Sequence, residues 1–337
     1  MKRIFVTGTA GFIGFHLSRL LLAEGFAVHG YDGLTDYYDV TLKQRRHAIL
    51  RENPAFAATE AMLEDDAALQ RAIDDFAPDA IVHLAAQAGV RYSLENPRAY
   101  ISANVNGTMN LMEGARRASV DHLLMASTSS VYGANTDMPF TETQRVVTPL
   151  TIYAATKMAN EAMGHSYAHL WDLPTTMFRF FTVYGPWGRP DMALFKFVRG
   201  ILEGEAIDIY NNGEMRRDFT YVEDLVAAIR RLIDVPPVRP ATPAEVPDGD
   251  SLSPVAPFRV VNIGNSDEVR LLDFIEAIED ALGKKAIRNY MPMQTGDVPA
   301  TFADTSLLRS LTGSVPGTDY REGIRRFVDW YREYYEA

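Results

Sequence analysis

A tyrosine and a lysine, Tyr153 and Lys157, stand four residues apart in the chain. At this spacing two side chains lie on one face of a helix. A free phenol has a pKa of about 10 and is a poor base at neutral pH, but a nearby ammonium group favours the phenolate and lowers that pKa. Such a tyrosine can accept a hydroxyl proton while a hydride leaves the same carbon. The alternative is an aromatic side chain on a buried face beside a solvated lysine, because this short pattern also arises by chance.

A second pattern with chemical meaning is the glycine spacing G-x-x-G-x-x-G at Gly8, Gly11 and Gly14. It follows an apolar stretch and precedes a helical pattern, so the backbone can approach a pyrophosphate at the N-terminus of a helix. An acid at the end of the next strand, Asp32, can accept hydrogen bonds from the adenosine ribose and repel a 2′-phosphate. The sequence therefore predicts a dinucleotide site that prefers NAD to NADP. The alternatives are a strand–helix turn without a ligand and a capping role for Asp32.

Three basic residues downstream of this acid bear on the choice of cofactor. Any one of Lys43, Arg45 and Arg46 could reach a phosphate. They weaken the prediction of NAD without reversing it.

Hydroxyl side chains gather in the run from Ser127 to Ser130, about 25 residues before the tyrosine and at the end of a predicted strand. Alone, each of these patterns is common. Together, the glycine turn, the hydroxyl run and the Tyr–Lys pair predict a site that removes a hydride from a carbinol carbon and a proton from its hydroxyl group.

Alternating strands and helices must position these residues in the first half of the chain. Such alternation is typical of a parallel, doubly wound sheet. The expected strands are Arg3–Thr7, Ala27–Tyr31, Asp79–Leu84, His122–Ser127 and Thr175–Arg179, and the expected helices are Gly11–Glu24, Lys43–Arg51, Asp65–Phe76, Pro97–Arg117 and Tyr153–Leu170.

The second half of the chain loses this rhythm. Its segment 236–257 contains seven prolines and is predicted to be a surface loop. The expected helices are Leu194–Leu202, Glu223–Ile233, Leu271–Leu282, Ser306–Leu311 and Glu322–Tyr335, and the expected strands are Arg259–Ile263 and, on either side of the Asn211-Asn212-Gly213 turn, Ala206–Tyr210 and Phe219–Val222.

Length and composition agree with an α/β protein of this organisation. The 337 residues carry a formal net charge of −11, which argues against a nucleic-acid binder. The absence of cysteine excludes disulfides, Cys-ligated zinc and cysteine nucleophiles, and it fits a reducing compartment. No apolar run approaches the length of a membrane span, and glycines interrupt the apolar N-terminus. We therefore expect a cytoplasmic protein that binds neither membrane nor nucleic acid and holds no metal.

The TGxxGxxG turn, the Ser/Thr at a strand end and the YxxxK pair together resemble the extended short-chain dehydrogenase/reductase superfamily. Over essentially the whole chain, the sequence is similar to its nucleotide-sugar epimerases, and most closely to bacterial UDP-glucuronate 4-epimerases. The most specific stretch is YGPWGRPDMALFKF, which begins at Tyr184. The other supporting stretches are Asp32–Lys43, His83–Ser93, Arg217–Val222 and Gly296–Asp304.

This resemblance implies a division of the chain into two lobes. We expect an NAD-binding Rossmann domain and a smaller C-terminal α/β lobe for the UDP-sugar, with the Pro-rich loop outside both. The Rossmann domain would comprise residues 1–182, with 217–235 and 258–265 returning to it, and the sugar lobe would comprise 183–216 and 266–337.

Carried over position by position, the resemblance also implies three sets of site residues. In catalysis Tyr153 would be the base, Lys157 its activator, and Thr128 the partner of the sugar O4, with Ser129 and Ser130 beside it. The UDP-sugar would meet Thr182, Arg189, Arg217 and Asp297. NAD would be bound by Gly8, Gly11, Phe12, Ile13, Gly14, Asp32, Leu63, Ala85, Ala86, Tyr153 and Lys157, while Asn104 and Ser127 stand where the family has cofactor or structural contacts.

Two positions depart from the family pattern around the adenine. The family has an acid near the end of the third strand that holds the adenine amine, and Met62 stands there in this chain. The usual Asn after Asp32 is Gly33. Either adenine binding is looser, or Glu64 or Asp65 takes the place of the missing acid.

The residues after Thr128 bear on which reaction follows oxidation at C4. Dehydrating relatives carry Asp-Glu there and decarboxylating relatives carry a Glu, whereas this chain has Ser129-Ser130. A 4-keto hexuronate is a β-keto acid that loses CO2 readily, so an epimerase must hold the carboxylate out of alignment with the ketone. Neutral hydroxyl donors from Thr128, Ser129, Ser130 and Thr182 suit that task; the alternative for the serines is capping of the strand end.

The expected activity is therefore NAD-dependent 4-epimerisation of UDP-glucuronate to UDP-galacturonate, an isomerase reaction. The alternatives are another UDP-hexose 4-epimerase, acting on glucose or N-acetylglucosamine sugars, a UDP-glucuronate decarboxylase, and an NAD-binding sensor without turnover. The family also implies a homodimer through the helices Pro97–Arg117 and Tyr153–Leu170. His83 is predicted to be structural, and Trp187 to belong to the cleft wall or to packing.

Overall fold

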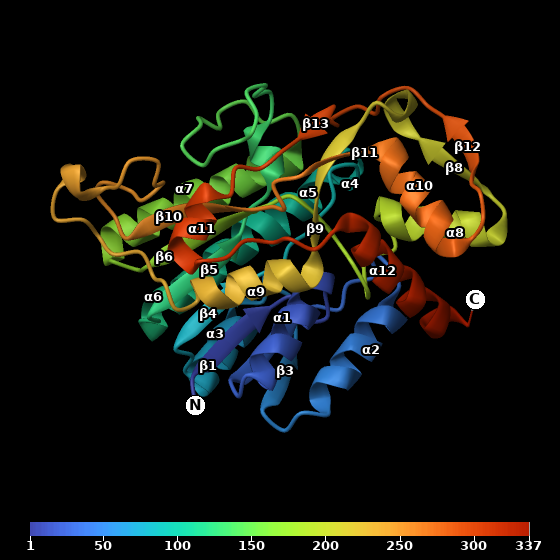
Figure 1. Ribbon diagram of the computed structural model, residues 1–337. Helices are drawn as coiled ribbons and strands as arrows, with labels where there is room; N and C mark the ends of the chain where they lie inside the picture. Colours follow the sequence, from blue (N-terminus) through green and yellow to red (C-terminus); the bar gives the residue numbers. More distant parts are fainter. Residues whose placement is uncertain (337) are drawn as a thin grey trace.

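The computed structural model describes residues 1–336, and a seven-stranded sheet forms its centre (Figure 1). The strand order is β10-β6-β5-β4-β1-β2-β3, and every neighbouring pair is parallel. The strands are β1 (Arg3–Thr7), β2 (Ala27–Asp32), β3 (Phe56–Glu60), β4 (Ala80–His83), β5 (His122–Ala126), β6 (Thr175–Phe180) and β10 (Phe258–Ile263). The predicted doubly wound α/β fold is confirmed.

The structure contains a strand, β3, that the apolar pattern of the sequence did not predict. Its sequence is FAATE, and only Phe56 is fully buried because β3 is the edge strand. A strand with one buried residue gives a weak hydrophobic signal.

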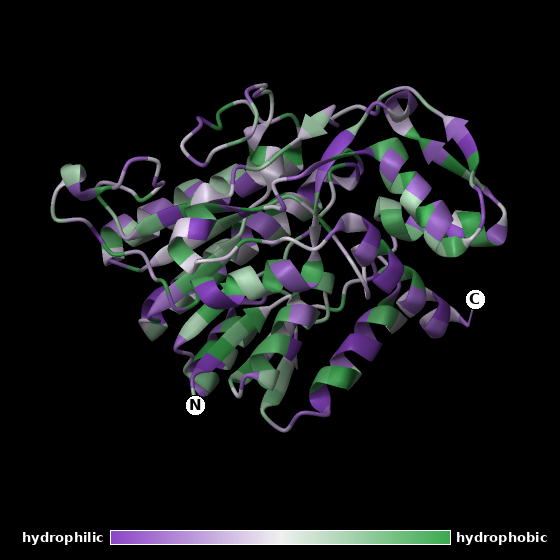
Figure 2. Ribbon diagram, viewed as in Figure 1, coloured by the Kyte–Doolittle hydropathy of each residue, from purple (hydrophilic) through white to green (hydrophobic). Residues whose placement is uncertain are grey.

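Helices cover both faces of the sheet, as the side chains of β1 illustrate. Ile4 and Val6 belong to one buried cluster and Phe5 to another, because successive side chains point to opposite faces. The first face is covered by α1 (Phe12–Ala23), α2 (Val40–Arg51), α9 (Val222–Leu232) and α11 (Ser306–Thr312), and the second by α3 (Asp66–Phe76), α6 (Thr108–Ala118) and α7 (Ile152–Trp171). Figure 2 shows the hydrophobic colour concentrated on the strands between these layers.

The predicted helix 97–117 is composite. It consists of α5 (Pro97–Tyr100), a π-helical segment η1 (Ile101–Gly107) and α6, and it follows the short α4 (Tyr92–Glu95). Such π-helical turns frequently occur at functional sites.

A second lobe contains two smaller sheets around a separate apolar core. The four-stranded sheet combines β7 (Thr182–Tyr184), β9 (Arg216–Tyr221), β11 (Glu268–Arg270) and β13 (Ala300–Thr301), and the two-stranded sheet pairs β8 (Ala206–Ile209) with β12 (Ile287–Tyr290). Its helices are α8 (Ala193–Glu203), α10 (Leu271–Leu282) and α12 (Tyr320–Tyr335).

The strands on either side of the Asn-Asn-Gly turn do not pair with each other. Strand β8 pairs with β12, whereas β9 pairs with β7, β11 and β13. Asn211 and Asn212 have φ angles of 51° and 50° in the short helical turn η3 (Tyr210–Gly213). The two left-handed residues redirect the chain into a different sheet.

The two segments expected to return to the first lobe differ in where they lie. Strand β10 joins the central sheet, and α9 packs against α1 in the same core. Strand β9, at the start of 217–235, belongs instead to the smaller four-stranded sheet.

The Pro-rich segment 236–257 extends beside the carboxyl end of α7, as predicted for a surface loop (Figure 1). It contains only the short turn η4 (Pro243–Glu245), and Arg239 ties it to Asp172 at 2.7 Å. Within residues 1–336, none of the helices has the length and apolar character that crossing a bilayer requires.

Candidate active site

A cavity of about 1100 Å³ opens between the carboxyl ends of the central strands and the second lobe. Ligands of doubly wound proteins bind at this edge of the sheet. The walls include all the predicted site residues except Asn104. The chain therefore brings residues from Gly8 to Asp297 into one continuous site.

The glycine turn forms the floor of one end of this cavity. Gly8 has a φ of 79°, and a Cβ there would lie 2.8 Å from the Ala85 nitrogen. A Cβ at Gly14 would lie 2.1 Å from the Gly8 carbonyl oxygen. The N-cap of α1, Gly11, provides no side-chain cap. Only glycine fits this close packing, and the helix N-terminus that it presents can cradle a diphosphate.

Asp32 holds the turn next to the glycines. Its carboxylate accepts hydrogen bonds from the backbone N–H groups of Ala10 and Leu34, both at 2.9 Å. The capping role and a place in the cavity wall are therefore compatible, because a carboxylate has further acceptor sites.

The three basic residues that follow Asp32 have different environments, and only Lys43 lines the cavity. Burial lowers the pKa of Lys43. Arg46 is fully buried and donates to the carbonyl oxygens of Ala10 and Gly188 at 2.8 and 3.3 Å. Arg45 lies over the ring of Tyr334 at 4.7 Å. Arg45 and Arg46 are thus engaged in packing outside the cavity wall.

Met62 stands where the family has an acid, and the environments of the residues after β3 show which of them could replace that acid. Met62 lies against Gly33, where its sulfur would be 2.3 Å from an added Cβ. Asp65 caps α3 by accepting from the Ala68 nitrogen at 3.0 Å and does not line the cavity. Glu64 does line it: one carboxylate oxygen accepts from Ser102 at 2.8 Å, and the other is buried without a partner.

His83 supports the cavity wall from behind, as predicted for a structural histidine. Its Nδ1 lies 2.7 Å from the Thr7 hydroxyl oxygen and its Nε2 lies 3.0 Å from the Thr108 hydroxyl oxygen. Thr7 also accepts from the backbone nitrogen of Ala85 at 3.0 Å. Burial lowers the pKa of His83 to about 3, so the ring is neutral.

Asn104 lies in the π-helical segment and acts behind the wall. Its amide oxygen accepts from the Gln87 nitrogen at 2.8 Å, and its amide nitrogen donates to the Gln87 carbonyl and the Thr156 hydroxyl at 3.0 and 3.1 Å. These contacts fix the segment after β4 against α7. Of the two roles that the sequence left open for Asn104, the structure places it in structural contacts.

Tyr153 and Lys157 both reach the cavity from α7. Lys157 donates to the Ala126 carbonyl oxygen at 3.0 Å, and burial lowers its pKa to about 8. Burial raises the pKa of Tyr153, while Thr128 and the charge of Arg189 act in the opposite direction. The expected lowering by the ammonium group of Lys157 is therefore not the dominant influence, because desolvation of the phenol is larger and Lys157 is held by the backbone of β5.

The hydroxyl run turns sharply at the end of β5. The Thr128 hydroxyl accepts from the Ser130 nitrogen and donates to the Ser130 hydroxyl, both at 3.2 Å. Thr128 caps the helical turn η2 (Ser129–Tyr132). Capping and exposure to the cavity coexist here, because Thr128, Ser129 and Ser130 all line its wall.

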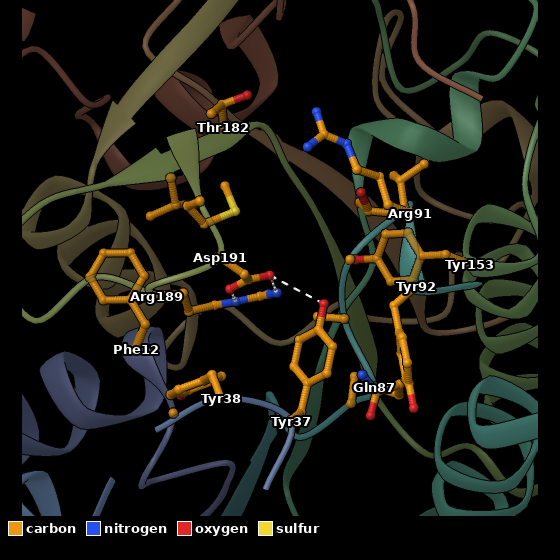
Figure 3. Close-up of a pocket in the computed structure, with 18 of the residues that line it drawn as sticks. Phe12, Tyr37, Tyr38, Gln87, Arg91, Tyr92, Tyr153, Thr182, Arg189 and Asp191 are labelled. Atoms are coloured by element: carbon orange, nitrogen blue, oxygen red, sulfur yellow. Dashed lines mark hydrogen bonds and ion pairs between the residues drawn. The ribbon is translucent and has the colours of Figure 1, made fainter. Parts of the chain in front are cut away.

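Arg189, a predicted site residue, forms an ion pair in the cavity with Asp191, which was not predicted (Figure 3). Arg189 contacts both carboxylate oxygens of Asp191, at 3.0 and 2.6 Å, and Tyr37 donates to the same carboxylate at 3.3 Å. Burial alone would raise the pKa of Asp191, but Arg189 holds it below its usual value. In Figure 3 Tyr153 lies on the other side of the cavity, beside Tyr92. Tyr37 and Asp191 stand within the stretches that carry the family resemblance, which was the only sequence signal for them.

The second lobe contributes another ion pair to the wall. Arg217 of β9 donates to Asp297 and to the Val298 carbonyl oxygen, both at 2.7 Å. Thr182 of β7 also lines the cavity. Arg91 was not predicted and lines the wall with its guanidinium 4.9 Å from the Tyr210 ring centroid.

Trp187 lies outside the cavity wall, in an aromatic cluster with Phe15, Trp330 and Tyr334 at centroid distances of 5.1–5.4 Å. Of the two roles that the sequence left open for Trp187, cleft wall or packing, the structure shows packing. The cluster joins α1 of the first lobe to α12 of the second.

Comparisons with known proteins agree with this architecture. Residues 4–241 match the model of the NAD dependent epimerase/dehydratase family. The chain is 57% identical over 333 residues to a probable UDP-glucuronate 4-epimerase of Rhizobium meliloti, covering 99% of this chain and 98% of that relative.

Two solved structures show the same fold. One is UDP-glucuronic acid 4-epimerase from Bacillus cereus in complex with UDP-glucuronic acid and NAD, with a TM-score of 0.88, 30% identity and coverage of 99% of this chain and 100% of that chain. The other is UDP-glucose 4-epimerase from Thermotoga maritima with UDP-glucose, with a TM-score of 0.85, 27% identity and 99% coverage of both chains. With the family model spanning most of its length, the chain belongs to the NAD dependent epimerase/dehydratase family.

Proposed function

We propose that the protein is an NAD-dependent UDP-glucuronate 4-epimerase that forms UDP-galacturonate through a 4-keto intermediate. The observation that carries this proposal is the neutral hydroxyl run Thr128–Ser130, which lines the same cavity as Tyr153 and contains no carboxylate. The 57% identity to a probable UDP-glucuronate 4-epimerase supports the same substrate.

The glycine turn fits a bound dinucleotide, because only glycines allow the backbone to pack this closely and so present the open N-terminus of α1 to a diphosphate. In the proposed complex Asp32 accepts from the adenosine ribose, while Ala85, Ala86 and Leu63 form apolar wall and Phe12 and Ile13 open α1. When bound, NAD would supply the nicotinamide carbon that exchanges the hydride with the sugar. Lys157 would hold the nicotinamide ribose, and Ser127 would support this end of the site.

Tyr153 is the proposed base that removes the proton from the sugar O4. Thr128 orients that hydroxyl group, and Lys157 keeps a positive charge close to the phenol when its pKa of about 8 leaves it protonated. For the reverse delivery of hydride, the keto-sugar turns within the cavity and presents its opposite face. The cavity of about 1100 Å³ includes the residues proposed to hold NAD and those proposed to hold the UDP-sugar, so both ligands share this space.

The substrate-binding residues of the proposal come from both lobes. Thr182, Ser129 and Ser130 donate to the C5 carboxylate, and Arg189 approaches the sugar or diphosphate. Arg217 and Asp297 hold the uridine diphosphate end. In the structure, each arginine already pairs with an acid, so binding exchanges these ion pairs for contacts with the ligand.

The nearest alternative is a UDP-hexose 4-epimerase with a neutral sugar, supported by the likeness to UDP-glucose 4-epimerase. A decarboxylase is disfavoured by the serines after Thr128. A sensor without turnover is disfavoured by the assembled Thr128, Tyr153 and Lys157.

The test is incubation of the purified holoprotein with UDP-glucuronate, followed by NMR of the sugar. UDP-galacturonate is the expected product. A pentose product would indicate decarboxylation, turnover of only UDP-glucose would indicate the neutral-sugar epimerase, and no substrate-driven change in absorbance at 340 nm and no product would indicate a sensor.

We also propose that Glu64 replaces the missing family acid at the adenine amine. In the proposed complex the adenine would lie on the β3 side of the ribose, and the unpartnered carboxylate oxygen of Glu64 would be its acceptor in the cavity wall. The parent should bind NAD more tightly than nicotinamide hypoxanthine dinucleotide, whose ring presents an oxygen instead of an amine, by about tenfold or more.

The variant Glu64→Gln should narrow or reverse this preference, because its amide can donate to that oxygen. Titration calorimetry of cofactor-free protein measures both affinities. Asp65→Asn, which changes the cap of α3, is the control. An unchanged preference in Glu64→Gln would leave adenine without a side-chain partner here.

A homodimer is proposed through the outer faces of the helical segments around α7. Apolar side chains are exposed there, namely Leu94, Ile101, Met109, Ile152, Leu170 and Trp171. Light scattering is expected to give twice the monomer mass.

The proposal also includes the two-lobe division and a cytoplasmic location. The location is proposed because a chain without cysteine suits a reducing compartment.

A further inference from the structure

A buried ion pair lies directly behind the hydroxyl run and has no part in the chemistry described so far. Arg179 of β6 donates to both carboxylate oxygens of Glu161 on α7, with Nε at 3.0 Å and Nη2 at 2.8 Å. Their side chains are only 3% and 9% exposed. Neither residue lines the cavity.

Glu161 holds the residue before the run. The Ser127 hydroxyl donates to the Glu161 carboxylate at 2.5 Å. Glu161 follows Lys157 by four residues on α7, so the two side chains leave the same helix face. Lys157 contacts Ala126 and Glu161 contacts Ser127, which fastens the carboxyl end of β5 to the helix that carries Tyr153.

Arg179 holds the other end of the run. Its guanidinium carbon lies 4.8 Å from the ring centroid of Tyr132, the last residue of η2. The Tyr132 hydroxyl donates to Asn262 at 2.7 Å, which anchors the far end of this side chain. The same ion pair therefore touches Ser127, directly before the Thr128–Ser130 run, and Tyr132, two residues after it.

From this arrangement we infer that Glu161 and Arg179 form a clamp that sets the position of Thr128, Ser129 and Ser130 relative to Tyr153. They are positioning residues, because they act through Ser127 and Tyr132. A planar guanidinium can hold the carboxylate at two points and stack on the ring at once, which lysine cannot do. The inference rests on the proposed function, since the run is the part of the site that restrains the keto-acid.

Two variants test the clamp. Arg179→Lys keeps the charge but loses the two-point contact and the stacking on Tyr132, whereas Ser127→Ala removes one hydrogen bond and leaves the ion pair intact. In both variants, kcat should fall on the order of tenfold. The reason is a displacement of the Thr128–Ser130 run relative to Tyr153, since a misplacement of about 1 Å can cost up to ~10²-fold in rate. The fraction of substrate that ends as pentose should rise several-fold, and the KM for UDP-glucuronate should change little. Bound NAD should change little in Arg179→Lys, because Arg179 lies outside the cavity wall.

The matched control is Arg259→Lys. Arg259 makes the same two-point contact with Asp250, at 2.9 and 3.0 Å, and both are nearly buried, but this pair lies outside the cavity wall. This variant should lose thermal stability while it keeps the parental ratio of epimer to pentose. If Arg179→Lys does not fold, Ser127→Ala decides.

The outcomes separate the clamp from the proposed function. If the parent protein forms no UDP-galacturonate, both the proposed function and the clamp are wrong. If the parent epimerises UDP-glucuronate but the folded variants keep its kcat and its product ratio, only the clamp is wrong.

Discussion

Replacing Tyr153 with phenylalanine should reduce turnover of UDP-glucuronate by about 10²–10⁴, the usual contribution of a general base. The substitution removes one oxygen and leaves the ring, which packs edge-on against Tyr100 at a centroid distance of 6.0 Å. Binding of NAD and of the UDP-sugar should stay close to that of the parent. Steady-state kinetics with a coupled product assay and calorimetric binding of UDP measure the two effects.

The matched control for this variant is Tyr167→Phe on the same helix. The Tyr167 hydroxyl donates to Glu113 at 2.5 Å and lies outside the cavity wall, so its loss should leave turnover near that of the parent. Turnover of Tyr153→Phe within a few-fold of the parent would rule out proton transfer by this phenol.

The double variant Ser129→Ala with Ser130→Ala should redirect the reaction from epimerisation toward loss of CO2. A hydrogen bond to a charged group contributes about 1.5–3 kcal/mol, and 1.4 kcal/mol corresponds to a tenfold change in a ratio. If each serine restrains the carboxylate of the keto-acid, the ratio of pentose to epimer should rise by roughly tenfold or more. The expected side products are UDP-4-keto-pentose, CO2 and NADH, since the hydride is then not returned.

The measurement is the product ratio by NMR together with the absorbance of NADH at 340 nm, because a lower rate alone does not separate chemistry from folding. Alanines at Ser306 and Ser310 of α11, outside the cavity wall, provide a control with the same composition change. If the double variant loses turnover without any rise in pentose, Thr182 or Arg189 becomes the restraint on the carboxylate.

The two predictions use different parts of the site and are distinguishable in one set of assays. Tyr153→Phe affects the removal of the proton, so both products should fall together. The serine variant acts after oxidation at C4, so the total amount of oxidised sugar should fall less than the amount of epimer. The clamp variants should resemble the serine variant, because Arg179 and Glu161 act through the same run.

The local patterns of the chain were sufficient for the Rossmann fold and for the residues within each strand–turn–helix unit. The spacing of Gly8, Gly11 and Gly14, the order of Tyr153 and Lys157, and the hydroxyls after β5 all depend on contacts a few residues apart in sequence. Helical and strand periodicity reports such contacts directly. The sequence did not predict the edge strand β3, the pairing of β8 with β12 or the pairing of β9 with β7. Each of these features depends on a partner that is distant in the sequence.

Only the tertiary structure decided which polar and charged side chains contact one another. Tyr37 and Asp191 are 154 positions apart, Arg217 and Asp297 are 80 apart, and Ser127 and Glu161 are 34 apart, yet each pair is within hydrogen-bonding distance. It also separated Lys43, which lines the cavity, from Arg46, which is buried in packing, and Glu64 from Asp65. By themselves, the residue types determined which chemistry was possible. The desolvation of each side chain and its hydrogen-bonding partners depend on the packing of both lobes. Desolvation and partners in turn decide which side chains are free to meet a ligand.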